Sequence, residues 1–198
     1  ALLAGNADLA LASRPITMPE EEKATTKGLK LEWRAIGNAG LALVTSNRNP
    51  VNELTLEQLK KIFTGEYTNW NQVGGPDEPI RCLTRRVPES GGAVFFMNTV
   101  LGKHPYGQTT VFTETWGAIM KVCATGKDLP IGIGPRMLAE RSGVKIIRVK
   151  QDDQSPAVLP SEQTMKDKTY PICVPIRLYW NAKTQDDRVT KFIEYCEQ

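Results

Sequence analysis

Short apolar segments alternate with segments of helical periodicity along most of the chain, and this alternation restricts the fold more than any other feature. "PIRCLTR" (79–85) and "VKIIRVK" (144–150) are typical of strands, while "LTLEQLKKIFTG" (54–65) has apolar residues at helical spacing. In that helix Thr55 is the expected N-cap and Gly65 the expected C-cap. Strands that alternate with helices predict an α/β fold with mostly parallel strands.

Composition excludes several classes of partner. The net charge of +3 over 198 residues is too small to favour nucleic acid. No apolar run reaches the roughly 18 residues that a membrane span needs. The chain opens in mid-pattern, without a start methionine or a signal peptide. We therefore expect that residues upstream of Ala1 are missing.

A loop after the strand 79–85 combines permanent positive charge with flexible backbone. The stretch "TRRVPESGGAVFF" carries two arginines, a serine and two glycines just before a helix that begins near Ala93. Helix N-termini attract anions, glycine allows close approach of the backbone, and guanidinium groups bind oxyanions through two hydrogen bonds. This pattern favours an oxyanion site, although a solvated rim is the simpler reading. The candidate residues are Arg85, Arg86, Ser90, Gly91 and Gly92.

One further stretch repeats this design, and a helix start is expected to face the same site. In "ADLALASRPITMPEEE" a strand ends at Ser13 and Arg14, ahead of a short helix. In "TETWGAIMKVCATG" (113–126) a helix opens after Glu114 and Thr115, and Thr115 is a candidate hydrogen-bond donor. In open α/β sheets ligands bind beyond the carboxyl ends of the strands, which is where these segments are expected.

The order of these motifs resembles a known family. "AGNADLALASRP", "NPVNELTLEQLKKIFTGEYTNWNQVGGPDEPI", the arginine and Ser-Gly loop, "IGIG" and "YPICVPIRLYWNAK" follow one another along the chain. Together they resemble the PstS-like substrate-binding proteins of bacterial ABC phosphate importers, which are type 2 periplasmic binding proteins. The resemblance covers essentially the whole chain, and the second block is its most specific part.

The resemblance implies an architecture and a starting point for the chain. The family has two α/β lobes with a ligand cleft between them. Here one lobe would comprise 1–42 and 134–198, and the inserted lobe 43–133. A strand–loop–helix start near the family's mature N-terminus supplies part of the anion site, and this sequence is expected to begin after it.

Site residues follow from the resemblance one at a time. Ser13 matches the family's serine, and Arg14 stands at the variable position that follows it. Arg86 matches the arginine that clamps the oxyanion, with Arg85 as the alternative. Ser90 and Gly91 match the Ser-Gly of a Gly-Ser-Gly-Thr turn. Glu89 and Gly92 replace the first glycine and the threonine of that turn, which leaves the identity of the anion open.

The resemblance also implies a function. The expected protein is an exported solute-binding protein, periplasmic or extracellular and in some cases lipid-anchored, that hands an oxyanion to an ABC permease, with phosphate as the favoured anion. The alternative is a ligand-sensing extracellular or regulatory domain of the same fold. We expect no enzyme, cofactor or metal, because no acid–base or metal-ligand pattern accompanies His104, the single histidine.

Two further expectations come from the predicted layout. Cys82 and Cys123 lie at a similar depth below the predicted site, and Cys173 and Cys196 at similar distances from the turn near Asn181. We therefore predict disulfides Cys82–Cys123 and Cys173–Cys196, with four buried thiols as the alternative. The abrupt start also predicts an unpaired sheet edge through which copies of the chain associate.

Overall fold

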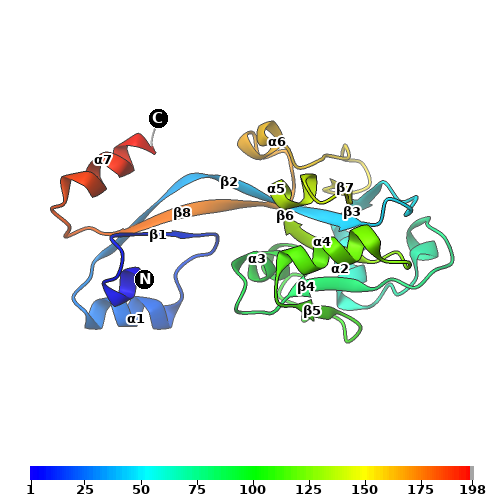
Figure 1. The fold of residues 1–198 in the computed structure, drawn as a ribbon, viewed down its shortest axis with the longest axis horizontal. Helices are drawn as coiled ribbons and strands as arrows, with labels where there is room; N and C mark the ends of the chain where they lie inside the picture. The colour runs from blue at the N-terminus through cyan, green and yellow to red at the C-terminus, as the bar shows by residue number, and fades with distance from the viewer. Residues whose placement is uncertain (197–198) are drawn as a thin grey trace. The chain divides into compact units, whose positions relative to one another are not determined.

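The computed structural model describes residues 1–196 and divides the chain into two compact units (Figure 1). One unit comprises Ala1–Asn38 and Pro175–Gln198, and the other comprises Ala39–Val174. Strands β2 (Leu31–Thr45) and β8 (Cys173–Asn181) each contribute residues to both units. The lobe boundaries expected from the sequence, 42/43 and 133/134, differ from these bounds. Residues 134–174 group with 43–133 because strand β7, at Lys145–Lys150, pairs with β2 and with β3 at Glu53–Thr55.

The smaller unit is built on a short antiparallel pair. β1 (Leu9–Ala12) pairs with β8, so that Leu9 lies opposite Trp180. Two helices, α1 (Met18–Thr26) and α7 (Asp187–Tyr195), lie on opposite sides of these strands, and a 3-10 turn, η1 (Leu2–Ala4), precedes them (Figure 1). The helix predicted over 186–198 is α7; its last two predicted positions, 197–198, lie outside the described residues.

The larger unit alternates strands and helices, as predicted. Helices connect β4, β5 and β6, and β4 is parallel to both of the others. The remaining strand pairs of this unit involve β2 and β3. β3 pairs with β7, and β2 is antiparallel to both β6 and β7. The elements of this unit not yet given are α2 (Leu56–Thr64), η2 (Trp70–Val73), β4 (Cys82–Arg85), α3 (Gly91–Thr99), β5 (Val111–Thr113), α4 (Trp116–Thr125), β6 (Ile131–Pro135), α5 (Arg136–Glu140) and α6 (Glu162–Lys166).

The strand directions are more mixed than the sequence predicted. A helix that connects two strands of one sheet allows them to run parallel, and the helices between β4 and β6 do so. β2 instead runs against both of its partners in the larger unit. The expected α/β class is therefore confirmed, whereas the expectation of mostly parallel strands is wrong.

Side chains of β2 alternate between two apolar clusters in the larger unit. Leu41 and Leu43 belong to a large cluster that includes the fully buried Trp70, and Ala42 and Val44 belong to a smaller cluster beneath α4. This is the alternation expected of a strand with both faces covered. The indole nitrogen of Trp70 donates a 2.7 Å hydrogen bond to the carbonyl of Leu129, which satisfies the one polar atom of that buried ring.

The predicted caps of α2 are confirmed. Thr55 accepts a hydrogen bond from the backbone N–H of Gln58, whose side chain accepts one from the N–H of Thr55. Gly65 ends the helix at a φ of 84°, in the left-handed region where glycine carries no steric cost.

Two glycines of β6 let α4 lie directly against the sheet. A Cβ atom on Gly132 would overlap Cγ2 of Ile119, and one on Gly134 would overlap Cε of Met120. Both partners are buried side chains of α4. The "IGIG" segment thus sets the distance between α4 and β6, and with it the position of the first turn of α4.

We expect Gly132→Ala to lower the free energy of unfolding by about 1–3 kcal/mol, because the buried Ile119 must move to admit the new methyl group. Gly37→Ala is the matched control, since a Cβ atom at that strand glycine meets nothing within 4 Å. Urea denaturation of both variants measures the difference, and equal midpoints would contradict this account of the "IGIG" segment.

Candidate functional site

The end of β4 and the start of α3 form a rigid corner. Ser90 is the N-cap of α3: its hydroxyl oxygen accepts a 3.4 Å hydrogen bond from the N–H of Ala93. The N–H of Ser90 in turn donates to the carbonyl of Arg86 at 3.1 Å. Ser90 is only 3% exposed. The cap leaves the hydroxyl hydrogen of Ser90 able to donate, and it leaves the N–H groups of Gly91 and Gly92 without partners inside the helix.

The two arginines of this corner have different surroundings. The guanidinium carbon of Arg85 lies 5.6 Å from the ring centroid of Trp116, and its Nε is buried without a hydrogen-bond partner among the described residues. Nε of Arg86 lies 3.8 Å from a carboxylate oxygen of Glu114, and both of these side chains are more than half exposed. Arg85 is therefore held by an aromatic ring, and Arg86 by a loose surface ion pair.

Trp116 also explains the glycine at position 92. A Cβ atom on Gly92 would lie 3.1 Å from Cζ2 of Trp116 and 3.3 Å from Cδ2 of Leu41. A side chain at the second position of α3 therefore requires Trp116 and Leu41 to shift by a few tenths of an ångström. The ring thus packs directly against the first turn of α3.

The start of α4 lies beside the start of α3 because of this packing. Thr115 is the N-cap of α4, and its hydroxyl oxygen accepts a 3.1 Å hydrogen bond from the N–H of Ala118. The positive ends of two helix dipoles and two guanidinium groups therefore meet at one corner of the larger unit. Such a corner stabilises a negative charge, and Glu114 already places one there.

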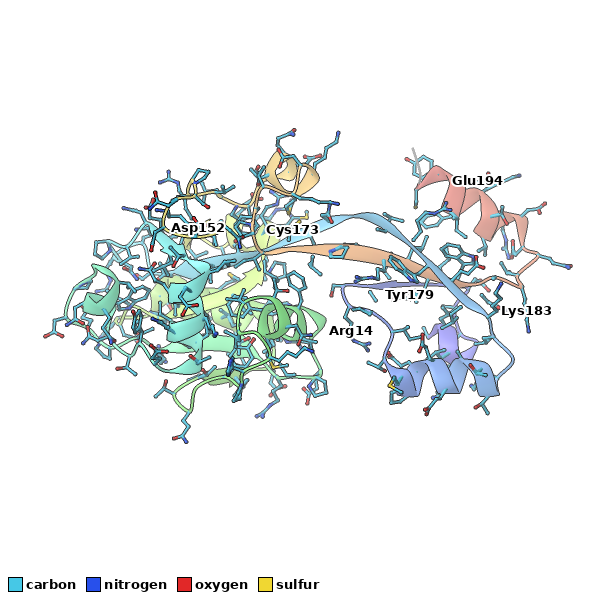
Figure 2. The ribbon with its side chains drawn as sticks, turned by 180° about the vertical axis from the view of Figure 1, so that it is seen from behind. Arg14, Asp152, Cys173, Tyr179, Lys183 and Glu194 are labelled. Atoms are coloured by element: carbon cyan, nitrogen blue, oxygen red, sulfur yellow. The ribbon has the colours of Figure 1, made fainter. Side chains whose placement is uncertain are left out.

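Ser13 and Arg14 belong to the smaller unit, at the end of β1. The guanidinium of Arg14 makes two hydrogen bonds to the carboxylate of Glu20, at 2.7 and 2.9 Å, and a third to the carbonyl of Pro15 at 3.0 Å. Its charge is thus paired within its own unit, where Figure 2 labels it beside α1. Ser13 is half-buried.

The Arg14–Glu20 ion pair makes the stability of the fold depend on pH. The hydrogen bonds from Arg14 lower the pKa of Glu20 from an ordinary 4.5 to about 2, with smaller contributions from Thr17. A carboxylate whose pKa is lower in the folded than in the unfolded state stabilises the fold at pH values above its unfolded pKa. This contribution is lost as the pH falls from about 4.5 towards 2. We expect Arg14→Ala to raise the Glu20 pKa towards its ordinary value, as measured by an NMR titration.

Asp186 is the internal control for that titration. Arg188 lowers the pKa of Asp186 to about 2 by the same kind of hydrogen bonding, so the Asp186 value should not move in the Arg14 variant. A Glu20 pKa that stays near 2 after removal of Arg14 would show that the capping contacts of Thr17 alone hold it there.

The predicted disulfides are not formed: all four cysteines are free thiols. Cys82 joins the large apolar cluster of the larger unit, whereas Cys123 joins the smaller cluster beneath α4. Alternation along β4 turns Cys82 away from α4, where Cys123 lies. Burial raises the pKa of both thiols to about 12. Cys173 points its sulfur to the carbonyl of Met165 at 3.7 Å, and Cys196 is also free.

The structure thus brings most of the predicted residues to one corner: Arg85, Arg86, Ser90, Gly91, Gly92 and Thr115 all lie there. Sequence reasoning missed the partners that hold the arginines, namely Trp116, Glu114 and Glu20. Only Glu20 had a readable signal, because Thr17 and Glu20 have the spacing of a capping box. Among the described residues no cluster of histidine, cysteine and acidic side chains is suited to a metal ion. No described helix is long and apolar enough to cross a membrane.

Comparison with known proteins decides the family. The model of the PBP superfamily domain matches residues 1–196. The chain belongs to this family. The phosphate-binding protein PstS of Staphylococcus haemolyticus is 30% identical over 98% of the chain and 62% of its own length, and that of Staphylococcus aureus strain USA300 is 29% identical. The chain therefore spans about 60% of the length of these curated relatives.

Solved structures support the same fold. An ABC-type phosphate transport receptor from Vibrio cholerae superposes with a TM-score of 0.75 at 27% identity, over all of this chain and 76% of that one. A phosphate-bound substrate-binding protein from Clostridium perfringens gives a TM-score of 0.77 at 24% identity, over 98% and 74% of the two chains, and shows the fold alone. The type 2 periplasmic-binding-protein fold expected from the sequence is confirmed.

Proposed function

We propose that this PBP-superfamily chain is the anion-binding part of an exported solute-binding protein, which captures phosphate and delivers it to an ABC permease. The observation that carries the proposal is the corner at the end of β4, where two arginines face the starts of two helices. The names of the relatives support phosphate as the anion and an ABC transporter as the partner. We assign the protein to the periplasm or cell exterior, lipid-anchored or free, and assign it no catalytic step.

The corner supplies the donors that a tetrahedral oxyanion requires. Arg86 clamps the anion through its guanidinium, the Ser90 hydroxyl donates to it, and the N–H groups of Gly91 and Gly92 contact it along the helix axis. Arg85 and Thr115 flank this set. Ser13 and Arg14 belong to the smaller unit, and their part in binding stays a prediction from the sequence.

The two departures from the family turn have different consequences. Glu89 is exposed, and its charge therefore acts on the site largely through water. Gly92 removes a hydroxyl donor and lets the Trp116 ring lie against the first turn of α3. The anion is therefore bound with one donor fewer than the family turn provides, beside an aromatic wall.

A ligand-sensing domain of the same fold is the alternative. A regulatory domain, that of CcmR from Synechocystis in complex with 2-PG, superposes at a TM-score of 0.59 and 16% identity, which shows the fold alone. The relatives with the higher identities carry the names of phosphate transport proteins. Transport is therefore the function we propose.

We expect Arg86→Ala, in the protein that carries this chain, to weaken the binding of inorganic phosphate by about 2 kcal/mol or more, the cost of removing one partner of a hydrogen-bonded charge pair. The melting temperature should change little, because Arg86 is 56% exposed. Isothermal calorimetry of both proteins measures the loss. Arg188→Ala, at an arginine that is 88% exposed and also paired with a carboxylate, is the control. Unchanged phosphate affinity in the Arg86 variant would contradict the proposal that Arg86 binds the anion.

We also propose that the chain of 198 residues associates with itself through β1. This strand ends the sheet in the described part of the chain, carries no charge and no proline, and includes Leu11, which is 64% exposed. Free edges of this kind pair readily with other strands. Light scattering over a range of concentrations should show dimers that Leu11→Lys abolishes. A monomer at every concentration would contradict the proposal.

A further inference from the structure

We propose that Trp116 is the positioning residue of the anion site: its ring fixes the Arg85 guanidinium and the first turn of α3 in one arrangement. The inference rests on the proposed function, because its readout is the binding of an oxyanion. Three observations on different elements support it, and all concern residues of the larger unit.

The first observation is the surroundings of Arg85. Its guanidinium carbon lies 5.6 Å from the Trp116 ring centroid, within the range of a cation–π interaction. Its Nε is buried and has no hydrogen-bond acceptor among the described residues. A buried guanidinium donor without an acceptor is costly. The ring offsets part of that cost without taking up a hydrogen bond, so Arg85 keeps its donors for an anion.

The second observation is the contact with Gly92. Cζ2 of Trp116 lies only 3.1 Å from the position that a Cβ atom on Gly92 would take. The ring therefore limits how the first turn of α3 can shift, and that turn holds the N–H groups that face an anion. Arg85 comes from β4 and Gly92 from α3, so a single side chain from α4 orders groups on two other elements.

The third observation is that Trp116 is itself held firmly. It packs against both apolar clusters of the larger unit, and Cε3 lies 3.7 Å from the position of a Cβ atom on Gly134. Thr115 caps the helix directly before it. A ring fixed on several sides can transmit its position to Arg85, whereas a mobile surface ring could not.

The test is a double-mutant cycle on phosphate affinity. Inorganic phosphate is titrated by calorimetry into the unmodified protein, Trp116→Ala, Arg85→Ala and the double variant. We expect Trp116→Ala to weaken binding about tenfold, the scale of a desolvated cation–π contact. The double variant should lose less affinity than the sum of the two single losses, because Trp116 acts on the anion partly through Arg85 and partly through the first turn of α3. The parallel cycle with Arg86→Ala should be additive, since Arg86 pairs with Glu114.

Two variants separate positioning from a general loss of structure. Trp116→Phe retains an aromatic ring, so its phosphate affinity should stay within about threefold of that of the unmodified protein. This variant replaces Trp116→Ala in the test if Trp116→Ala does not fold. Gly92→Ala should displace the ring and weaken binding, while Gly117→Ala should not, because a Cβ atom there meets only Oγ1 of Thr115 at 3.8 Å.

The outcomes are distinguishable. Additive effects of the Trp116 and Arg85 substitutions, or equal affinities of Gly92→Ala and Gly117→Ala, would overturn the positioning role while leaving the proposed function intact. An unmodified protein that binds neither phosphate nor another oxyanion would overturn both together. The inference would be established if the loss of phosphate affinity in Trp116→Ala were non-additive with Arg85→Ala but additive with Arg86→Ala, and if Trp116→Phe retained its affinity.

Discussion

The close packing of α4 on β6 is the constraint on which the candidate site depends. Gly132 and Gly134 present no side chains to α4, so Ile119 and Met120 lie directly on the strand. This contact brings the start of α4 near enough to the sheet for Trp116 to reach Gly92 of α3. Because β4 is parallel to β6 and lies next to it, the same ring also meets the guanidinium of Arg85 at the end of β4. A pair of strand glycines thus determines where an arginine two elements away can point.

The three arginines predicted as site residues differ in how firmly each is held within its own unit. Arg14 is held by a short, two-point ion pair, so an anion would compete with a carboxylate already in place. Arg86 is held by a single contact of 3.8 Å to an exposed carboxylate, which contributes little and is easily displaced. Arg85 has an aromatic partner that accepts no conventional hydrogen bond. The larger unit therefore supplies the readily available positive charge.

Sequence reasoning predicted local structure well where a residue acts on its own neighbours. Thr55 and Gly65 limit α2 as predicted, because caps depend on backbone groups within a few positions. It failed where the partner comes from a distant segment. The Cys82–Cys123 bridge was predicted from depth alone, but the face on which Cys82 lies depends on which neighbours β4 acquires in the sheet. The mixed strand directions escaped prediction for the same reason, because they follow from the pairing of β2 with β6 and β7.

The glycine at position 92 shows how a distant contact changes the meaning of a local motif. Read along the sequence, Gly92 is a lost hydroxyl donor in an anion-binding turn. In the structure it is the space into which Trp116 fits. A hydroxyl side chain there would supply a further hydrogen-bond donor, but its Cβ atom would press on the ring that packs against Arg85, whose Nε is buried without an acceptor among the described residues. A side chain at position 92 and the present position of the Trp116 ring are therefore coupled, because a Cβ atom there requires the ring to shift by a few tenths of an ångström. In this chain the Trp116 ring lies against both Gly92 and the guanidinium of Arg85.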